Sequence, residues 1–316
     1  MAALSDTRPL VLAVGGPTAT GKTALSVRLA RLFGGEIINA DSMQIYRGLD
    51  IGTAKAAIAE RQGIPHHLLD IRSPEEPFSV ADFTALAEQN IREITARGAL
   101  PVLVGGTGLY ITSLLKGVRF TPEKGDPAVR KALSERAAAG EGPRLYAELQ
   151  QVDPAYAAAV HPNNQPRVIR ALELYRSTGK TMSEQRAQSL PEQPPYRALC
   201  LCLSCRERAA LYARIDERVE RMVEDGVLRE AEWVWQHRAV CPTAAQAIGY
   251  KEFFSYFEGT DTLENCVAAL QQASRNYAKR QLTWFKRQND AVWLYTDDPA
   301  MPAQAEELVK RFLQRA

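Results

Sequence analysis

The chain has 316 residues, of which 46% are hydrophobic and 24% charged, and its formal net charge is +2. At roughly 150 residues per domain, this length predicts about two domains with enough apolar surface for a real core. The composition excludes disordered and collagen-like proteins, and no apolar run approaches the ~18 residues of a membrane span. Because the net charge is small, any nucleic-acid partner must be recognised by a local basic patch.

The compartment is predicted from the first residues and from cysteine usage. The start of the chain lacks the apolar core of a signal peptide. Five cysteines, an odd number, argue against a disulfide framework and suit a reducing compartment. The sequence therefore predicts a cytoplasmic protein.

The first third of the chain alternates apolar strands with amphipathic helices. Strands are predicted at 10–14, 36–39 and 101–104, and helices at 23–33 and about 80–96. This alternation is typical of an α/β domain with a parallel sheet, in which ligands bind at the loops that follow the strands.

The loop after the first predicted strand satisfies the pattern G-x-x-x-x-G-K-[ST] and leads directly into a predicted helix. Its residues are Gly16, Pro17, Thr18, Ala19, Thr20, Gly21, Lys22 and Thr23. The glycines let successive N–H groups and the helix N-terminus face an anion, Lys22 adds a point charge, and the Thr23 hydroxyl can hold Mg²⁺. The sequence therefore predicts a P-loop that binds a diphosphate or triphosphate group, with Thr23 as a metal ligand.

Polar residues also follow the next two predicted strands. Asp41 comes after the second strand, at the strand edge where the P-loop lies. Its carboxylate can act as a general base, hold Mg²⁺ through water or cap the following turn, and the sequence leaves these three roles open. Gly105-Gly-Thr-Gly108 follows the third strand; there the backbone can approach a ligand closely and Thr107 offers a hydroxyl group.

The alternation of predicted strands and helices ends after residue 117. A stretch rich in helix breakers at 119–127 precedes helical, alanine-rich sequence from 128 to about 187, and a stiff proline-rich connection lies at 191–195. We therefore predict a first part of the α/β core at 1–119, an inserted helical module at 120–196, and a return to the core at 197–316.

The third segment opens with an alternating pattern and continues mostly as helix. Leucine alternates with cysteine or serine over 199–204, which favours a buried core strand over a metal site. On a helix predicted at about 207–225, Arg214, Arg218 and Arg221 share a face away from the apolar stripe. A solvated face with a Glu217–Arg221 pair is the plainer interpretation, and an arginine clamp on phosphate is the alternative.

The segment 275–287 combines five cationic residues with three aromatic ones. Such a helix suits contact with an RNA backbone and stacking on bases. The same residues would also serve as a buried apolar stripe with the cations outside, and the sequence does not decide between these two interpretations.

Together these motifs resemble the bacterial tRNA dimethylallyltransferases, also called tRNA isopentenyltransferases. The resemblance covers nearly the whole chain and rests on the P-loop, on 41–55 and on 105–110. It continues in His161-Pro-Asn, Arg167-Val-Ile-Arg-Ala-Leu-Glu173, Ser177-Thr-Gly-Lys180, Ile248-Gly-Tyr250 and Lys279-Arg-Gln-Leu-Thr-Trp284. The match over 41–55 is far more specific than a P-loop alone.

The resemblance implies a P-loop NTPase-like parallel sheet flanked by helices, with an inserted helical module that contacts tRNA. It implies transfer of the dimethylallyl group from dimethylallyl diphosphate to the exocyclic N6 amine of the adenosine immediately 3′ of the anticodon, with release of diphosphate. Mg²⁺ is the cofactor that it implies, and the anticodon stem-loop of tRNA is the partner. We further expect a monomer that does not associate with a membrane.

The resemblance also assigns residues to roles. Asp41 matches the base that acts on the adenine amine, Thr107 a contact to the reacting group or base, and Arg218 the arginine that binds diphosphate. The residues that match tRNA-contacting segments are Asp41, Ser42, Met43, Gln44, Arg130, Pro166, Arg167, Val168, Ile169, Arg170, Gln246, Ala247, Ile248, Gly249, Tyr250, Lys251, Lys279, Arg280, Gln281, Leu282, Thr283, Trp284, Phe285 and Lys286.

Two other classes of protein remain open. A small-molecule or nucleoside kinase would use the same P-loop, with the helical module as a lid, and would require ATP. A non-catalytic RNA-binding NTPase would hydrolyse nucleotide without modifying the RNA. Neither class accounts for the match over 41–55.

Overall fold

The structure is a computed structural model that describes residues 6–120, 126–288 and 290–314. It divides into two compact units, a larger one formed by the chain up to Leu115 and from Pro195 onward, and a smaller one formed by Lys116–Pro194. The smaller unit therefore starts and ends a few residues before the bounds of 120 and 196 expected from the sequence. The reason at its start is local: the preceding helix ends at Lys116, and Gly117 turns the chain with φ 65°.

The larger unit is built on a parallel sheet, which has six strands in the described part of the chain. They are β1 Leu10–Gly15, β2 Gly35–Asn39, β3 His66–His67, β4 Leu100–Val104, β5 Arg197–Ser204 and β6 Ala291–Tyr295. The strand order is β3-β2-β4-β1-β5-β6, and each pairing is parallel. The predicted α/β class is confirmed. The sequence reasoning missed β3 and β6, the two edge strands; β3 has only two residues, 66–67, which is too few to show a period.

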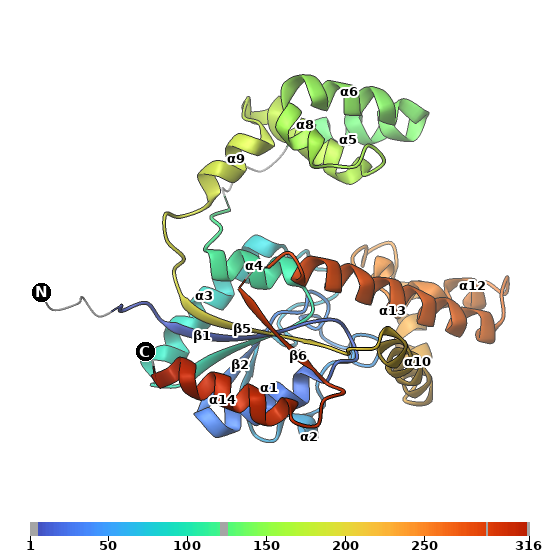
Figure 1. Cartoon of the computed structure of the whole chain (residues 1–316). Helices are drawn as coiled ribbons and strands as arrows, with labels where there is room; N and C mark the ends of the chain where they lie inside the picture. The colour runs from blue at the N-terminus through green and yellow to red at the C-terminus, as the bar shows by residue number, and fades with distance from the viewer. Residues whose placement is uncertain (1–5, 121–125, 289, 315–316) are drawn as a thin grey trace, which may run out of the picture. The chain divides into compact units, whose positions relative to one another are not determined.

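Helices cover both faces of this sheet (Figure 1). The helices of the larger unit are α1 Lys22–Phe33, α2 Ile58–Arg61, α3 Val80–Ala96, α4 Gly108–Lys116, α10 Arg208–Glu224, α11 Val227–Gln236, η2 Ala244–Gln246, η3 Lys251–Phe253, α12 Phe254–Phe257, α13 Leu263–Phe285 and α14 Met301–Gln314. Helices α1 and α14 pack on one face, and α3, α4 and the end of α13 pack on the other. The predicted helix over 80–96 matches α3, which Ser79 and Asp82 start with a capping box.

Strand β5 shows how the alternating sequence serves this arrangement. Leu201 and Leu203 pack with α1 and α14, whereas Cys202 faces α3, α4 and Phe285 on the opposite side of the sheet. Because successive side chains of a strand point to opposite faces, each face receives its own apolar set. Cys202 thus lies in the core, as the alternation predicted.

The smaller unit is helical. Its elements are α5 Pro127–Arg136, a π-helical turn η1 Ala137–Glu141, α6 Gly142–Val152, α7 Pro154–Ala158, α8 Gln165–Thr178 and α9 Met182–Ser189. Leu133, Leu145, Leu149, Val168 and Leu172 form its core. In the described residues of both units, every helix is too short or too polar to span a membrane.

Candidate active site

The loop between β1 and α1 places three residues in left-handed backbone conformations. Gly16 has φ 132°, Ala19 has φ 61°, and Gly21, the N-cap of α1, has φ 70°. A Cβ atom on residue 16 would lie 2.4 Å from the carbonyl oxygen of Leu203, so only glycine fits there. Such turns of the backbone form concave sites lined with N–H groups, and α1 begins directly behind this one. The loop therefore has the backbone geometry of a phosphate-binding P-loop.

Lys22, the first residue of α1, lies half-buried against this loop. Its Nζ atom donates a hydrogen bond of 2.7 Å to the carbonyl oxygen of Pro17. Burial lowers the pKa of Lys22 to about 8, the nearby Arg218 cation adds to the shift, and the Asp41 carboxylate opposes it. Because the charges of Lys22 and Arg218 destabilise each other, an anion that binds to both is favoured.

Asp41 lies in a tight turn that directly follows β2. Its N–H donates to Oδ1 of Asn39 at 3.2 Å, and its own Oδ1 accepts a hydrogen bond of 2.9 Å from the N–H of Met43. Asn39 is buried and donates in turn to the carbonyl oxygen of Leu68 at 3.1 Å. Asp41 therefore caps the turn, one of its three possible roles, through Oδ1. Its second oxygen, Oδ2, accepts no hydrogen bond from the described residues and can serve either of the other roles.

The second glycine loop, residues 105–108, packs directly on the Asp41 turn. Oγ1 of Thr107 accepts a hydrogen bond of 3.1 Å from the N–H of Ser42 and donates one of 3.3 Å to Oγ of Ser42. A Cβ atom on Gly105 would lie 2.2 Å from the carbonyl oxygen of Ala40, so the two loops touch through their backbones. Thr107 thus fixes the turn that carries Asp41.

The three arginines of α10 have different partners. Arg214 donates to Oγ1 of Thr296 at 2.5 Å, and Arg221 pairs with Glu217 at 3.7 Å, where both side chains are exposed. Arg218 lines the same cavity as Lys22 and Asp41. Burial lowers the pKa of Arg218, and the Asp41 carboxylate opposes that shift. Of the two interpretations of this helix face, the solvated pair holds for Arg221, and a phosphate clamp by Arg218 stays a prediction.

The P-loop, the Asp41 turn and Arg218 border one cavity of about 1420 Å³ in the larger unit, whereas Thr107 supports the turn from outside its wall. Its wall includes the P-loop from Thr18 to Thr23, the turn from Asp41 to Gln44, and Arg218. Tyr277 of α13, which sequence reasoning did not select, also lines it. Burial raises the pKa of Tyr277 and the Asp41 carboxylate adds to the shift, so this hydroxyl stays protonated. The cavity thus brings the P-loop together with Lys22, Arg218 and the carboxylate of Asp41.

Gln281 of α13 bridges two loops at the base of this cavity. Its Oε1 accepts a hydrogen bond of 2.9 Å from the N–H of Thr18, and its Nε2 donates one of 3.0 Å to the carbonyl oxygen of Gly106. A Cβ atom on Gly106 would lie 2.3 Å from Nε2, so the glycine makes room for the amide. Gln281 therefore holds the P-loop and the second glycine loop at a fixed separation.

The end of α13 has a buried side and an exposed side. Nε1 of Trp284 donates to Oγ1 of Thr112 at 3.1 Å, and Phe285 is buried against Gly15. Lys279, Arg280, Thr283 and Lys286 are exposed. The buried-stripe interpretation of the segment 275–287 therefore holds for Trp284 and Phe285, with exposed cations outside, and contact of this face with RNA stays a prediction.

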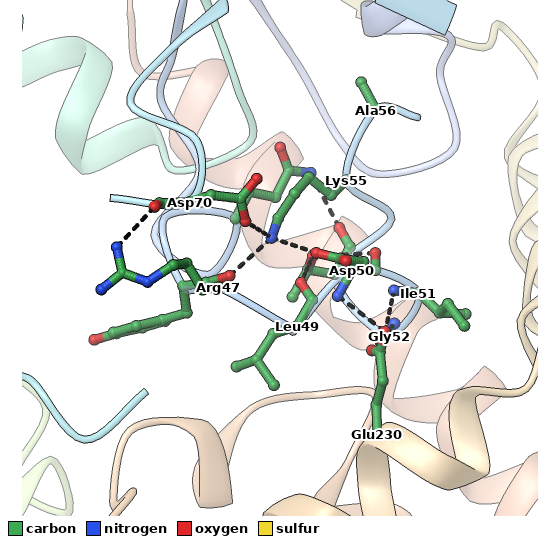
Figure 2. Close-up of polar contacts among 12 residues, drawn as sticks. Arg47, Leu49, Asp50, Ile51, Gly52, Lys55, Ala56, Asp70 and Glu230 are labelled. Atoms are coloured by element: carbon green, nitrogen blue, oxygen red, sulfur yellow. Dashed lines mark hydrogen bonds and ion pairs between the residues drawn. The ribbon is translucent and has the colours of Figure 1, made fainter. Parts of the chain in front are cut away.

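The loop from Asp50 to Lys55 is held by a network of charged side chains (Figure 2). The buried Nζ of Lys55 pairs with Oδ1 of Asp50 and with Oδ1 of Asp70, each at 2.5 Å, and donates to the carbonyl oxygen of Tyr46 at 2.7 Å. Glu230 of α11 accepts hydrogen bonds from the same loop. The specific sequence match over 41–55 thus corresponds to a loop with dense internal bonding that borders the cavity.

A family model described as IPP transferase matches residues 44–288 of the chain. The chain belongs to the IPP transferase family. Among curated relatives, a tRNA dimethylallyltransferase of Geobacillus thermodenitrificans is 47% identical over 96% of this chain and 96% of its own length. One of Bacillus subtilis is 46% identical over 94% of each chain.

Solved structures of similar proteins support the same assignment. The tRNA isopentenylpyrophosphate transferase of Bacillus halodurans superposes with a TM-score of 0.73 at 42% identity, covering 98% of this chain and 97% of that one. A eukaryotic dimethylallyltransferase acting on tRNA gives a TM-score of 0.82 at 30% identity, covering 97% of this chain and 80% of that one. The predicted P-loop NTPase-like core, with its parallel sheet and flanking helices, is confirmed.

In this IPP transferase, several residues that match tRNA-contacting segments have side chains in a core. Val168, Tyr250 and Phe285 are almost fully buried, and Gln281 makes the bridge described above. A buried side chain is not available to touch RNA in this structure, and contact of these segments with tRNA stays a prediction. The residues Gln246, Ala247, Ile248, Gly249 and Lys251, by contrast, line the cavity.

The helical unit of the transferase contributes the other matched residues. Pro166 and Arg167 are exposed at the start of α8. Arg130 and Arg170 both pair with Oε2 of the buried Glu173, at 3.2 Å and 3.0 Å. The shared carboxylate fixes the two guanidinium groups beside each other on the surface of this unit.

We expect Gln281→Leu to destabilise the protein, because it leaves the partly buried N–H of Thr18 and the buried carbonyl group of Gly106 without their partner. Each unsatisfied group costs about 1–3 kcal/mol. Urea denaturation should show a lower free energy of unfolding for Gln281→Leu. The control is Gln236→Leu, at the exposed end of α11, whose free energy of unfolding should be close to that of the wild type. Equal stability of both variants would mean that the bridge contributes little.

Proposed function

We propose that this chain transfers the dimethylallyl group from dimethylallyl diphosphate to the N6 amine of the adenosine immediately 3′ of the anticodon in tRNA, releasing diphosphate. The observation that carries the proposal is the placement of Lys22, Arg218 and Asp41 around one cavity in a chain of the IPP transferase family. Relatives named tRNA dimethylallyltransferase match nearly the whole length of the chain.

The leaving group accounts for the P-loop. When the allylic C–O bond breaks, negative charge builds on the departing diphosphate, whereas in a kinase the P–O bond breaks. The N–H groups of the loop, Lys22 and Arg218 supply the positive charge that stabilises it. In the free protein these two cations destabilise each other, and an anionic diphosphate bound to both relieves this repulsion.

Asp41 is suited to accept the proton of the attacking amine. A new N–C bond forms as the C–O bond breaks, and the N6 proton passes to the carboxylate oxygen Oδ2. The other oxygen is held by the N–H of Met43 at 2.9 Å, which fixes the orientation of the group. Thr107 supports this geometry through Ser42.

The oxygen donors around the cavity suit a divalent metal. The Thr23 hydroxyl and the Asp41 carboxylate line the same cavity, and Mg²⁺ prefers such ligands together with substrate phosphates. We infer that Thr23 holds Mg²⁺, with Asp41 close enough to act through water. When bound, the ion neutralises charge on the diphosphate.

The partner that we infer is the anticodon stem-loop of tRNA. The exposed cations Lys279, Arg280 and Lys286 and the exposed Arg167 suit phosphate contacts. We further propose that the protein acts as a monomer. We place the protein in the cytoplasm with its substrate, and no finding favours the kinase alternative.

The test is a reaction without nucleotide. Purified protein, Mg²⁺, unmodified tRNA and dimethylallyl diphosphate should give isopentenylated adenosine and free diphosphate, because the donor already contains an activated allylic bond. Mass spectrometry of digested tRNA measures the product, and omission of the donor is the control. If modification failed without ATP while ATP was hydrolysed or its phosphoryl group transferred, the proposal would be wrong.

A further inference from the structure

Glu230 lies outside the cavity wall, yet its carboxylate is fully engaged by a loop that forms part of that wall. Oε1 accepts hydrogen bonds from the N–H groups of Asp50 at 3.0 Å and Ile51 at 2.8 Å. Oε2 accepts from the N–H of Gly52 at 3.0 Å and from the hydroxyl of Tyr250 at 3.0 Å (Figure 2 shows the three loop residues around Glu230). Four donors thus occupy the acceptor sites of one carboxylate.

The backbone around these bonds is shaped to fit them. A Cβ atom on Gly52 would lie 2.4 Å from the ring of Tyr250, and one on Gly249 would lie 2.8 Å from the carbonyl oxygen of Gly52. Tyr250 is fully buried. Glu230 therefore joins α11, the loop at 50–52 and the segment at 246–250 at a single point.

The same loop determines the position of Gln44 in the cavity wall. Nε2 of Gln44 donates to the carbonyl oxygens of Thr53 at 3.0 Å and Ala54 at 3.2 Å. Thr53 is tied back to the loop through its hydroxyl, which donates to the carbonyl oxygen of Leu49 at 2.7 Å. Because both side-chain donors are used inside the protein, Gln44 can offer its amide oxygen Oε1 to a substrate.

We propose that Glu230 is a positioning residue for RNA recognition: it fixes the 50–54 loop and thereby orients Gln44 toward the tRNA substrate. This inference rests on the proposed function. The P-loop, Lys22 and Arg218 lie outside its hydrogen-bond network, so it acts on the RNA side of the reaction and leaves binding of the diphosphate donor unchanged.

Glu230→Gln is the direct test. The amide keeps the size of the carboxylate but turns an N–H₂ group toward either the Asp50 and Ile51 donors or the Gly52 donor, whichever way it is oriented. We expect the KM for tRNA to rise about tenfold, with the KM for dimethylallyl diphosphate and the rate at saturating tRNA little changed. Glu232→Gln, on the exposed side of the same helix, is the matched control and should behave as wild type.

Two further variants separate positioning from general stability. Tyr250→Phe removes one of the four donors and keeps the ring against Gly52, so we expect a smaller rise in the KM for tRNA. This variant tests the inference even if Glu230→Gln fails to fold. Gln44→Ala combined with Glu230→Gln should weaken tRNA binding no more than the stronger single change, because both act through one contact. Hydrogen exchange should show faster amides at 50–52 in Glu230→Gln.

The outcomes that would overturn the inference are specific. They are unchanged tRNA affinity in Glu230→Gln and Tyr250→Phe, an equal rise in the KM for both substrates, or full additivity with Gln44→Ala. Failure of the wild-type chain to modify tRNA would instead contradict the proposed function itself.

Discussion

Lys22→Ala is expected to slow dimethylallyl transfer by about 10²-fold or more at saturating substrates, because it removes a charge that stabilises the departing diphosphate. The Nζ atom lies beside the P-loop carbonyl of Pro17, within the electrostatic reach of both Arg218 and Asp41. Residues 16–23 contain no second lysine that could replace it. Single-turnover kinetics with enzyme in excess measures the chemical step directly.

The control for this variant is Lys310→Ala, which removes an exposed lysine of α14 outside the cavity. It should transfer the group at the wild-type rate. Loss of activity in Lys22→Ala through a higher KM for the donor alone, with the single-turnover rate intact, would show that Lys22 binds ground state and transition state equally. A near-normal rate with a normal KM would remove Lys22 from the mechanism.

Asp41→Asn is expected to lower kcat by about 10²-fold to 10⁴-fold with little change in tRNA affinity. An asparagine oxygen can still accept the 2.9 Å hydrogen bond from the N–H of Met43, so the turn is preserved. The oxygen that we propose as acceptor of the N6 proton is replaced by an amide group, which cannot act as a base. Steady-state kinetics together with RNA-binding titrations separate the two quantities.

Asp290→Asn, at an exposed carboxylate outside the cavity, is the matched control and should leave kcat unchanged. Weak tRNA binding with an intact kcat in Asp41→Asn would demote Asp41 to a positioning role. If Asp41→Asn lost activity and its remaining rate no longer depended on the Mg²⁺ concentration, the result would instead favour the second role, in which Asp41 acts on Mg²⁺ through water.

The sequence by itself determined the features that depend on neighbouring residues. The P-loop could be predicted because its glycines, Lys22 and Thr23 act within one strand-loop-helix unit. The helix predicted at about 80–96 matched α3, whose start is capped by the neighbouring residues Ser79 and Asp82. The alternation through Leu201, Cys202 and Leu203 was enough to predict β5, since the two faces of a strand differ at every residue.

The tertiary structure alone decided which side chains of a matched segment face the cavity and which face a core. Gln281 is 263 residues from Thr18, the residue whose N–H it binds, and Glu230 is 178 residues from Gly52. The sequence around a single glutamine or glutamate on a helix carries no record of such partners, because long-range packing selects them. Val168 and Phe285 became core residues for the same reason: burial depends on what the rest of the chain places against a helix face.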